Sequence, residues 1–295
     1  MTEQSFLRTI SDVGRIITAI DSTVRFPEVV DILVAKYGGA IDIFCQLIAE
    51  SSSSADVLRK IRTQGRDPDE RMALLKMYRR CVAPVLDTEK TKKIRKVDSE
   101  TLIENYGDTF KPITKLQRQF AALPKEYRYA LAALVGEYDT RGQLGYQLTN
   151  EFFEWFEHTF SDLYTIDGPR GAGRDIELSE LFPEFPGSYP CDFVIKRAAD
   201  DQVLAIGFAR YDSTRGGAQS DDRTGGNANK VEKAKAFASV LPRRLKLIFL
   251  SDGPGLEHGD TWEESCALDG QWGGRVRVTT LKLAEARITP DWLEG

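Results

Sequence analysis

The sequence predicts an α/β (α+β) protein. An all-helical N-terminal domain, residues 1–145, is expected to precede a domain with a mixed β-sheet flanked by helices, residues 146–295. Two observations predict this. Apolar residues recur three and four positions apart through the first half, which is the period of an α-helix. The second half instead has apolar runs bounded by turn residues and separated by amphipathic segments, an order typical of a sheet with helices against it.

Composition restricts the class of protein. The 295 residues are 41% hydrophobic and 29% charged, as in soluble globular proteins. A net charge of −5 excludes binders that rely on a uniformly positive surface. The four cysteines are far apart, which predicts neither a zinc site nor a disulfide framework. Reduced cysteines, charges at the N-terminus and no apolar run of membrane length predict a cytoplasmic protein.

Six apolar residues predict a first helix: Phe6, Ile10, Val13, Ile16, Ile17 and Ile20. Two helices, 27–37 and 40–50, are expected on either side of Gly38-Gly39, because paired glycines end helices. Further helices are expected over 56–62, 68–82, 99–106, 109–123 and 124–138. The basic run Thr88–Lys96 is interpreted as a solvated face or linker that could also contact a phosphate backbone.

The second half begins with an aromatic helix over 151–160. A β-hairpin follows, with arms 191–196 and 203–211 and a polar turn at 199–202. The remaining elements are expected to be a helix over 227–240, a buried strand over 245–251, a helix over 261–268 and an alternating strand over 276–283.

Two acidic residues mark the hairpin, Asp192 at the start of its first arm and Asp212 after its second. Carboxylates fixed by strands hold Mg²⁺, usually one or two per ion with water and phosphate oxygens completing the coordination. Asp192 and Asp212 are therefore the predicted metal ligands, and phosphate-ester chemistry is the predicted reaction. Arg210 shares a strand face with Asp212 and is expected to stabilise charge on the phosphate.

The segment 213–227 is rich in Gly and polar residues and is predicted to be a loop that follows a polyanion, with a disordered surface loop as the alternative. Arginines there suit phosphates or guanine edges, and amides suit base edges. The residues expected to contact DNA are Arg170, Arg174, Arg215, Gln219, Arg223, Asn227 and Lys230.

The stretch 145–251 resembles the core of the PD-(D/E)XK nuclease superfamily, especially type II restriction endonucleases. The features that carry this resemblance are a helix with an early Glu151, a G-x-G-x-D sequence ending at Asp175, a strand opened by Asp192, a second strand ending in Arg210-Tyr211, and an amphipathic helix. The resemblance implies a restriction-endonuclease-like core and Mg²⁺-dependent cleavage of double-stranded DNA at a short sequence. It also implies a homodimer and a cognate DNA methyltransferase as companion.

The carry-over from the family is partial. Asp192 stands where the family has its metal-binding aspartate, with one residue inserted after the proline, and Glu151 matches a helix glutamate that some members direct at the metal. The family's acid and lysine, two apart on the next strand, are expected near 207–209, where neither residue type occurs. Arg210 and Asp212 are the substitute pair, in reversed order.

Two alternatives for the site remain open. Asp175 and Glu177 present two carboxylates on one strand face and could be the metal site. Lys196, on the strand face of Asp192, or Lys230 on the following helix could replace the missing lysine and orient or deprotonate the attacking water.

The predicted function is a magnesium-dependent, sequence-specific DNA endonuclease of the restriction type. The predicted catalytic residues are Asp192, Asp212, Arg210, Glu151 and Lys196. The alternatives are a sequence-specific DNA-binding protein without catalysis, motivated by Gly207 and Ala209 at the expected catalytic positions, and a DNA repair nuclease.

Overall fold

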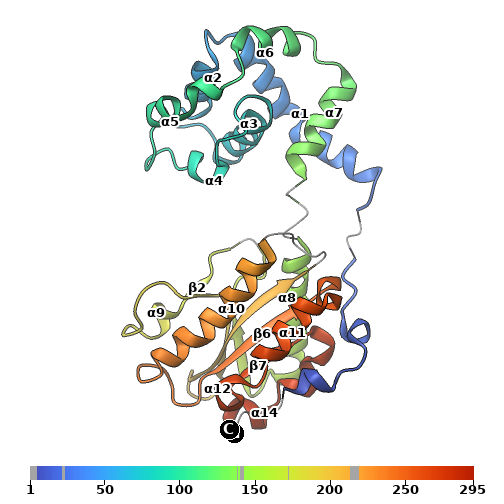
Figure 1. The fold of residues 1–295 in the computed structure, drawn as a ribbon, viewed down its shortest axis with the longest axis vertical. Coiled ribbons are helices and arrows are strands. Elements are labelled where there is room, and N and C mark those ends of the chain that lie inside the picture. Colours follow the sequence, from blue (N-terminus) through green and yellow to red (C-terminus); the bar gives the residue numbers. More distant parts are fainter. Residues whose placement is uncertain (1–4, 22–23, 138, 140–142, 172, 213–218) are drawn as a thin grey trace. The chain divides into compact units, whose positions relative to one another are not determined.

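The structure is a computed structural model. It describes the chain apart from residues 1–4, 22–23, 138, 140–142, 172 and 213–218, and over 219–225 it describes the backbone alone. The chain forms two compact units, Ser22–Thr140 and a unit that joins Met1–Asp21 to Arg141–Gly295 (Figure 1). The first 21 residues, expected in the helical domain, thus belong to the sheet unit.

The unit Ser22–Thr140 is helical. Its elements are α1 (Glu28–Ala49), α2 (Ser54–Ile61), α3 (Pro68–Cys81), α4 (Thr88–Thr91), α5 (Ser99–Tyr106), a 3₁₀ turn (Gly107–Thr109), α6 (Ile113–Phe120) and α7 (Lys125–Gly136). Side chains of Ser53, Asp67 and Asp98 accept hydrogen bonds from the first-turn amides of α2, α3 and α5. These caps explain why the starts of α2, α3 and α5 lie within two residues of the expected positions.

Helix α1 runs through Gly38-Gly39, so the expectation of two helices was wrong. Its buried side includes Leu33, Tyr37, Ile41 and Phe44, which pack in the core of the helical unit. That packing outweighs the roughly 1 kcal/mol by which each glycine disfavours a helix. Among the described residues α1 alone is long and apolar enough to cross a membrane, by length and composition only.

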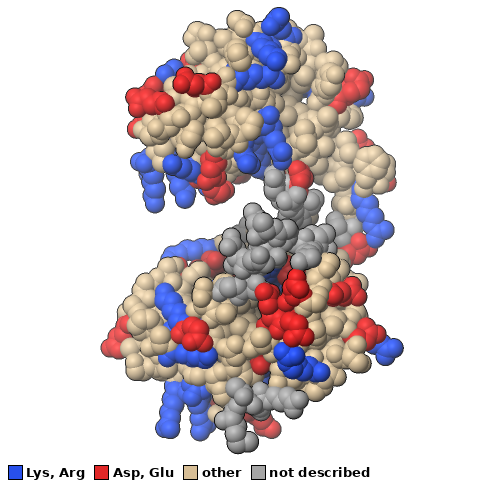
Figure 2. Space-filling model, viewed as in Figure 1, with Lys and Arg blue, Asp and Glu red and all other residues tan. Residues whose placement is uncertain are grey.

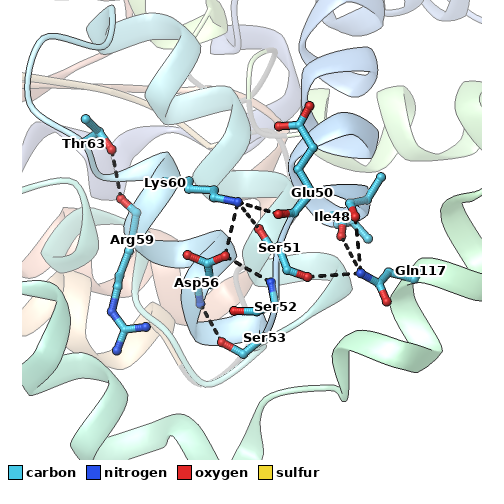
Figure 3. A network of polar contacts seen from close by, with 11 residues as sticks. Ile48, Glu50, Ser51, Ser52, Ser53, Asp56, Arg59, Lys60, Thr63 and Gln117 are labelled. Carbon is cyan, nitrogen blue, oxygen red and sulfur yellow. Dashed lines mark hydrogen bonds and ion pairs between the residues drawn. The ribbon is translucent and has the colours of Figure 1, made fainter.

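The end of α1 is bound by polar side chains from two other helices (Figure 3). Gln117 of α6 donates hydrogen bonds to the carbonyls of Ile48 and Ser51, at 3.2 and 3.1 Å. Lys60 of α2 donates to the carbonyl of Glu50 at 2.8 Å and pairs with Asp56 at 3.2 Å. The carbonyl of Ile48 in the last turn of α1 and the carbonyls of Glu50 and Ser51 directly after it are therefore hydrogen-bonded to side chains.

The sheet unit contains a five-stranded mixed sheet. Its strands, in spatial order, are β1 (Tyr164–Asp167), β4 (Phe193–Arg197), β5 (Val203–Tyr211), β6 (Lys246–Asp252) and β7 (Val276–Thr279). A small ribbon pairs β2 (Ile176–Glu177) with β3 (Pro190–Cys191). The helices are α8 (Gln143–Phe160), α9 (Leu178–Leu181), α10 (Gln219–Ala236), α11 (Gly259–Leu268), α12 (Gln271–Gly274), α13 (Ala284–Arg287) and α14 (Pro290–Glu294). Short 3₁₀ helices span Phe6–Thr9, Val13–Ile16, Pro254–Glu257 and Leu281–Leu283.

The hairpin β4–β5 is antiparallel, as predicted, and β5 runs parallel to β6 through the crossover helix α10. Alternate residues of the strands face opposite layers. Phe193 and Ile195 pack with the aromatic side of α8, whereas Val194 and Phe208 pack with Val231 of α10. The prediction of a mixed sheet flanked by helices, with a helical region before it, is confirmed.

Four elements differ from the sequence prediction. α10 begins at Gln219, so eight residues expected in the polar loop are helical in their backbone. Strand β1 was not expected, and the strand expected to reach residue 283 ends at Thr279. The helix expected over 6–20 is instead two 3₁₀ turns, because the apolar residues of that segment meet the sheet unit singly and only Leu7 and Ile16 are buried.

The segment 5–20, here called the N-terminal arm, is bound to the sheet unit by hydrogen bonds. The buried carboxylate of Asp252, at the end of β6, accepts from the amide of Thr18 at 2.8 Å. The Tyr211 hydroxyl accepts from the amide of Ile20 at 3.3 Å and donates to the carbonyl of Thr18 at 3.1 Å. The arm is thus attached to the ends of β5 and β6.

Candidate active site

A pocket of about 220 Å³ lies between the sheet and α10, where β5 and β6 end. Phe208 and Arg210 of β5 line it beside their register partners on β6, Phe249 and Ser251. The other lining residues are Asp192, Ala209, Gly226, Asn227 and Lys230. The carboxyl edge of parallel strands is where open α/β sheets bind ligands, because the following helices leave a crevice there.

Asp192 enters the pocket from the residue before β4. Its amide donates to the carbonyl of Gly207 at 2.9 Å, and its Oδ2 accepts from the amide of Ala209 at 2.7 Å. Burial raises the pKa of this carboxyl group, an effect opposed by the Ala209 amide and by Lys230 and reinforced by Asp175. The surrounding protein therefore does not fully offset the cost of burying the negative charge of Asp192. A cation bound nearby would favour the ionised form.

Lys230 reaches the same pocket from α10. Its Nζ lies 3.7 Å from the centroid of the Phe208 ring, and its carbonyl accepts from the Tyr189 hydroxyl at 2.9 Å. Burial lowers the pKa of Lys230, and the negative charges of Asp192 and Asp175 partly restore it. The sequence prediction considered Lys196 and Lys230 as the lysine of the site. Of these two, Lys230 lines the same pocket as Asp192.

The structure gives the two acids of the alternative pair, Asp175 and Glu177, different surroundings. Asp175 is exposed and close enough for its charge to raise the pKa of Asp192. Glu177 accepts from the hydroxyl of Ser188 and the amide of Tyr189, both at 2.7 Å, and these bonds lower its pKa. Glu177 thus stabilises the β2–β3 ribbon. Of the two acids, it is Asp175 whose charge raises the pKa of Asp192.

Arg210 and Asp212 form an ion pair with each other. The Arg210 Nε donates to Asp212 Oδ1 at 2.7 Å, and one terminal nitrogen lies 2.6 Å from the same oxygen. Asp212 does not line the pocket, and its carbonyl accepts from the amide of Gly255 at 2.7 Å. The expected pairing of Asp192 with Asp212 is therefore replaced by a pairing of Asp212 with Arg210.

Gly207 lies at the position on β5 where the sequence resemblance led us to expect an acid, and the fold leaves no room for a side chain there. A Cβ atom built at Gly207 would lie 1.9 Å from the Phe193 ring, which fills the space beside the strand. That ring packs against Phe152 and Phe153 of α8, with centroid distances of 5.1 and 6.0 Å. A side chain at position 207 is excluded because an aromatic core occupies its place.

Lys196 and Glu151, predicted as catalytic, are held elsewhere. Lys196 Nζ lies 2.6 Å from Asp167 Oδ2 on β1. Four residues along an extended strand also separate it from Asp192 by about 13 Å. Glu151 accepts from Gln147 at 2.9 Å on α8, the helix that covers the other face of the sheet. Neither residue lines the pocket.

The residues predicted to contact DNA fall into three groups. Arg170 pairs with Glu157, and Arg174 pairs with Glu180, so both arginines are neutralised within the chain. Asn227 and Lys230 line the pocket. Arg215 lies outside the described residues, and so do the side chains of Gln219 and Arg223.

Phe208 and Ser251 line the site and were missed by the sequence prediction. Phe208 lies two residues before Arg210 on the same strand face, so the period of two was a usable signal. The sequence showed Ser251 only as the end of an apolar strand. Its place opposite Arg210 depends on how α10 returns the chain to pair β6 with β5, which the sequence pattern does not give.

The carboxylates present fit one hard divalent cation. Oδ1 of Asp192 accepts no hydrogen bond from the described residues, and the charge of Asp175 is among the causes that raise the pKa of Asp192. Mg²⁺ is commonly held by one or two carboxylates with water in the remaining positions. Within the described part of the chain, three or more His, Cys, Asp or Glu side chains do not gather in a metal-binding group.

Comparison of the chain with protein-family models, with curated proteins and with solved structures found no match.

Proposed function

We propose that the chain is a Mg²⁺-dependent endonuclease of the type II restriction kind that hydrolyses phosphodiester bonds of double-stranded DNA. The observation that carries this proposal is the meeting of Asp192, Lys230 and Arg210 in one pocket at the carboxyl edge of β5 and β6, where the charge of Asp175 also acts on Asp192. A carboxylate, a lysine with lowered pKa and an arginine are the groups that phosphodiester hydrolysis needs.

The order of elements supports the same reading. The sequence resemblance to the PD-(D/E)XK core runs through a helix, a hairpin opened by an aspartate, a second helix and a strand. In the fold these are α8, β4–β5, α10 and β6, with α8 and α10 on opposite faces of the sheet. Asp192 stands at the start of the hairpin and Lys230 on the second helix.

Asp192 and Asp175 would hold the metal ion in this proposal. When bound, Mg²⁺ would polarise the phosphate and make a bound water more acidic. Asp212, expected from the sequence as a second ligand, is given another role here. Its ion pair fixes the orientation of Arg210, so Asp212 acts as a positioning residue.

The remaining chemistry belongs to the chain's own side chains. A water oxygen attacks phosphorus, the bond from phosphorus to the 3′ oxygen breaks, and that oxygen takes a proton from solvent. The proton lost by the water passes to the neutral amine of Lys230, whose lowered pKa increases the neutral fraction at a given pH. Arg210 donates hydrogen bonds to the phosphate oxygens that gain charge.

Incubation of the protein with plasmid DNA and Mg²⁺ tests the proposal. Discrete fragments are expected, whereas random nicking would indicate a repair or structure-selective nuclease. Asp192→Asn and Lys230→Met should each lower the cleavage rate by at least about 100-fold, in line with the contribution of a general base. DNA binding in Ca²⁺ should be kept.

Lys196→Met and Glu151→Gln are the matched controls, because both residues were expected to be catalytic and lie away from the pocket. Both variants should cleave at the wild-type rate. If Lys196→Met abolishes cleavage and Lys230→Met does not, the assignment of Lys230 is wrong.

A second candidate is a sequence-specific DNA-binding protein without catalysis. Gly207 and Ala209 at the positions of the family's catalytic pair favour it, together with the neutralisation of Arg210 by Asp212. Its signature would be sequence-specific binding of DNA with no cleavage in Mg²⁺ or Mn²⁺.

A further inference from the structure

A groove of about 590 Å³ lies in the helical unit, between the turn that joins α2 to α3 and the segment that joins α4 to α5. Six cationic side chains line it: Arg66, Arg71, Lys92, Lys93, Arg95 and Lys96. Gln64, Gly65 and Ile94 complete the lining, which contains no carboxylate. Figure 2 shows Lys and Arg side chains projecting from the side of this unit on which α4 lies in Figure 1.

The geometry of the groove is built into the fold by Arg62. This buried side chain, at the end of α2, donates to the carbonyls of Thr91 and Val97 and to the hydroxyl of Ser99. These three bonds fix both ends of the basic segment 92–96 against α2. The segment is therefore a positioned wall of the groove and not a free linker.

Most of the positive charge in the groove is not neutralised by the described residues. Glu70 pairs with Arg66, and Glu89 pairs with Lys92. Arg71, Lys93, Arg95 and Lys96 form no ion pair with any residue that the structure describes. In addition, the Nε atoms of Arg66 and Arg71 are buried and donate no hydrogen bond to any residue that the structure describes. Four such cations in a chain of net charge −5 form a local anion-attracting surface.

We propose that this basic groove binds the phosphate backbone of double-stranded DNA. The inference rests on the proposed function for its choice of DNA, although it requires no cleavage. Phosphate oxygens would take the place of the missing carboxylates beside Lys93, Arg95, Lys96 and Arg71. No aromatic side chain lines the groove, and proteins that hold single strands use aromatic rings on which bases stack, so the lining favours a duplex.

The test is the salt dependence of binding to a fluorescent duplex of mixed sequence, measured by anisotropy in Ca²⁺ with the full chain. Lys93→Gln, Arg95→Gln and Lys96→Gln combined should weaken binding about tenfold or more and reduce the slope of log K against log salt by about 2 to 3. The exchange Lys93→Arg, Arg95→Lys and Lys96→Arg keeps the charge and should keep the affinity.

The matched control removes three exposed cations of the same unit that do not line the groove. Lys115, Arg118 and Lys125 lie on α6 and α7, and Gln at these positions makes the same change in net charge. This variant should lower the slope by much less. Circular dichroism melts of both triple variants show whether the fold is retained.

Three outcomes would overturn the proposal: an equal effect of both triple variants, tighter binding of single-stranded DNA or RNA than of duplex, or wild-type binding abolished by inorganic phosphate at low concentration. If the groove variant loses binding to anionic lipid vesicles that the wild type has, while its binding to duplex DNA is unchanged, the groove binds a membrane surface instead. If duplex binding depends on the groove but Mg²⁺ gives no cleavage, the groove stands and the nuclease proposal fails. If cleavage depends on Asp192 while the groove variant binds duplex DNA normally, the nuclease proposal stands and the groove proposal fails.

Discussion

The buried carboxylate of Asp192 makes a prediction about stability and pH. Burial raises its pKa in the folded state, so the folded protein binds this proton more tightly than the unfolded chain does. The resulting loss of stability begins as pH rises past the unfolded value of about 3.9 and is complete above the folded pKa. Asp192→Asn, whose side-chain oxygen can still accept from Ala209, should therefore unfold at higher urea concentration at neutral pH.

The same variant should lose this advantage in acid, where Asp192 is protonated in both states. Mg²⁺ should stabilise the wild type and leave Asp192→Asn unchanged, because only the carboxylate attracts the ion. Tryptophan fluorescence during urea unfolding measures both effects. An Asp192→Asn protein less stable than wild type at neutral pH would show that the carboxylate is well compensated, contrary to the structure.

Gly207→Ala tests whether the Phe193 ring excludes a side chain from β5. The added Cβ would lie within 2.5 Å of three ring atoms in a fully buried aromatic cluster. Overpacking of this kind costs about 1 to 3 kcal/mol, and the large overlap places the expected cost toward the upper end. Urea unfolding gives the value, and Phe193→Leu in the same chain should recover part of it. Additive effects of the two changes would contradict the steric explanation.

At the residue scale the sequence named much of the site but not its pairings. Asp192, Arg210, Asn227 and Lys230 were all identified as candidates, and all line one pocket. The metal partner of Asp192 was expected to be Asp212 because both acids mark hairpin ends. The ion pair with Arg210 could not be predicted, since residues two apart on a strand only share a face and need not bind each other.

At the scale of elements, the continuity of α1 can be tested, because the sequence predicted two helices where the structure has one. A Cβ at Gly39 meets nothing within 4 Å, and the residue sits inside a continuous helix. Gly39→Ala should therefore stabilise the helical unit by about 0.5 to 1 kcal/mol. Far-UV circular dichroism is the suitable measurement, because all four tryptophans belong to the sheet unit. Destabilisation would indicate a glycine-dependent break at Gly38-Gly39.

The elements that the sequence predicted well have strong local signals. The hairpin β4–β5 has two apolar arms and a polar turn, and β6 is a continuous apolar run, so both could be placed from periodicity. Strand β1 was missed because it has four residues and gains its stability from pairing with β4. The start of α10 was missed because glycine and polar residues favour loops, and local preference gave no reason to extend the helix back to Gln219.

At the scale of the whole molecule, the N-terminal arm shows that the order of the chain and the division into units differ. The arm belongs to the sheet unit, although the helical unit follows it directly in sequence. The sequence prediction assigned the arm to the helical domain because its apolar residues recur three and four positions apart. The contacts that decide its place join residues more than 190 positions apart, such as Thr18 and Asp252, and no local pattern announces them.

Asp269 is the residue on which these long-range connections converge. Its Oδ1 accepts from the amide of Val278 at 3.1 Å and pairs with the buried guanidinium of Arg287, while Oδ2 accepts from the Ser5 hydroxyl and the Leu7 amide at 3.2 and 3.4 Å. One carboxylate thus joins the N-terminal arm, β7 and α13. Because Asp269 and Arg287 are both buried, removing the charge of Asp269 breaks a buried ion pair.

Asp269→Asn is therefore expected to destabilise the sheet unit by about 3 to 5 kcal/mol, since the amide keeps the shape but cannot neutralise Arg287. The loss should appear as a lower urea midpoint of the tryptophan fluorescence transition. A paired replacement, Asp269→Leu with Arg287→Met, removes both charges and should recover a large part of the loss. If Asp269→Asn alone unfolds at the wild-type midpoint, the Asp269–Arg287 ion pair does not stabilise the sheet unit.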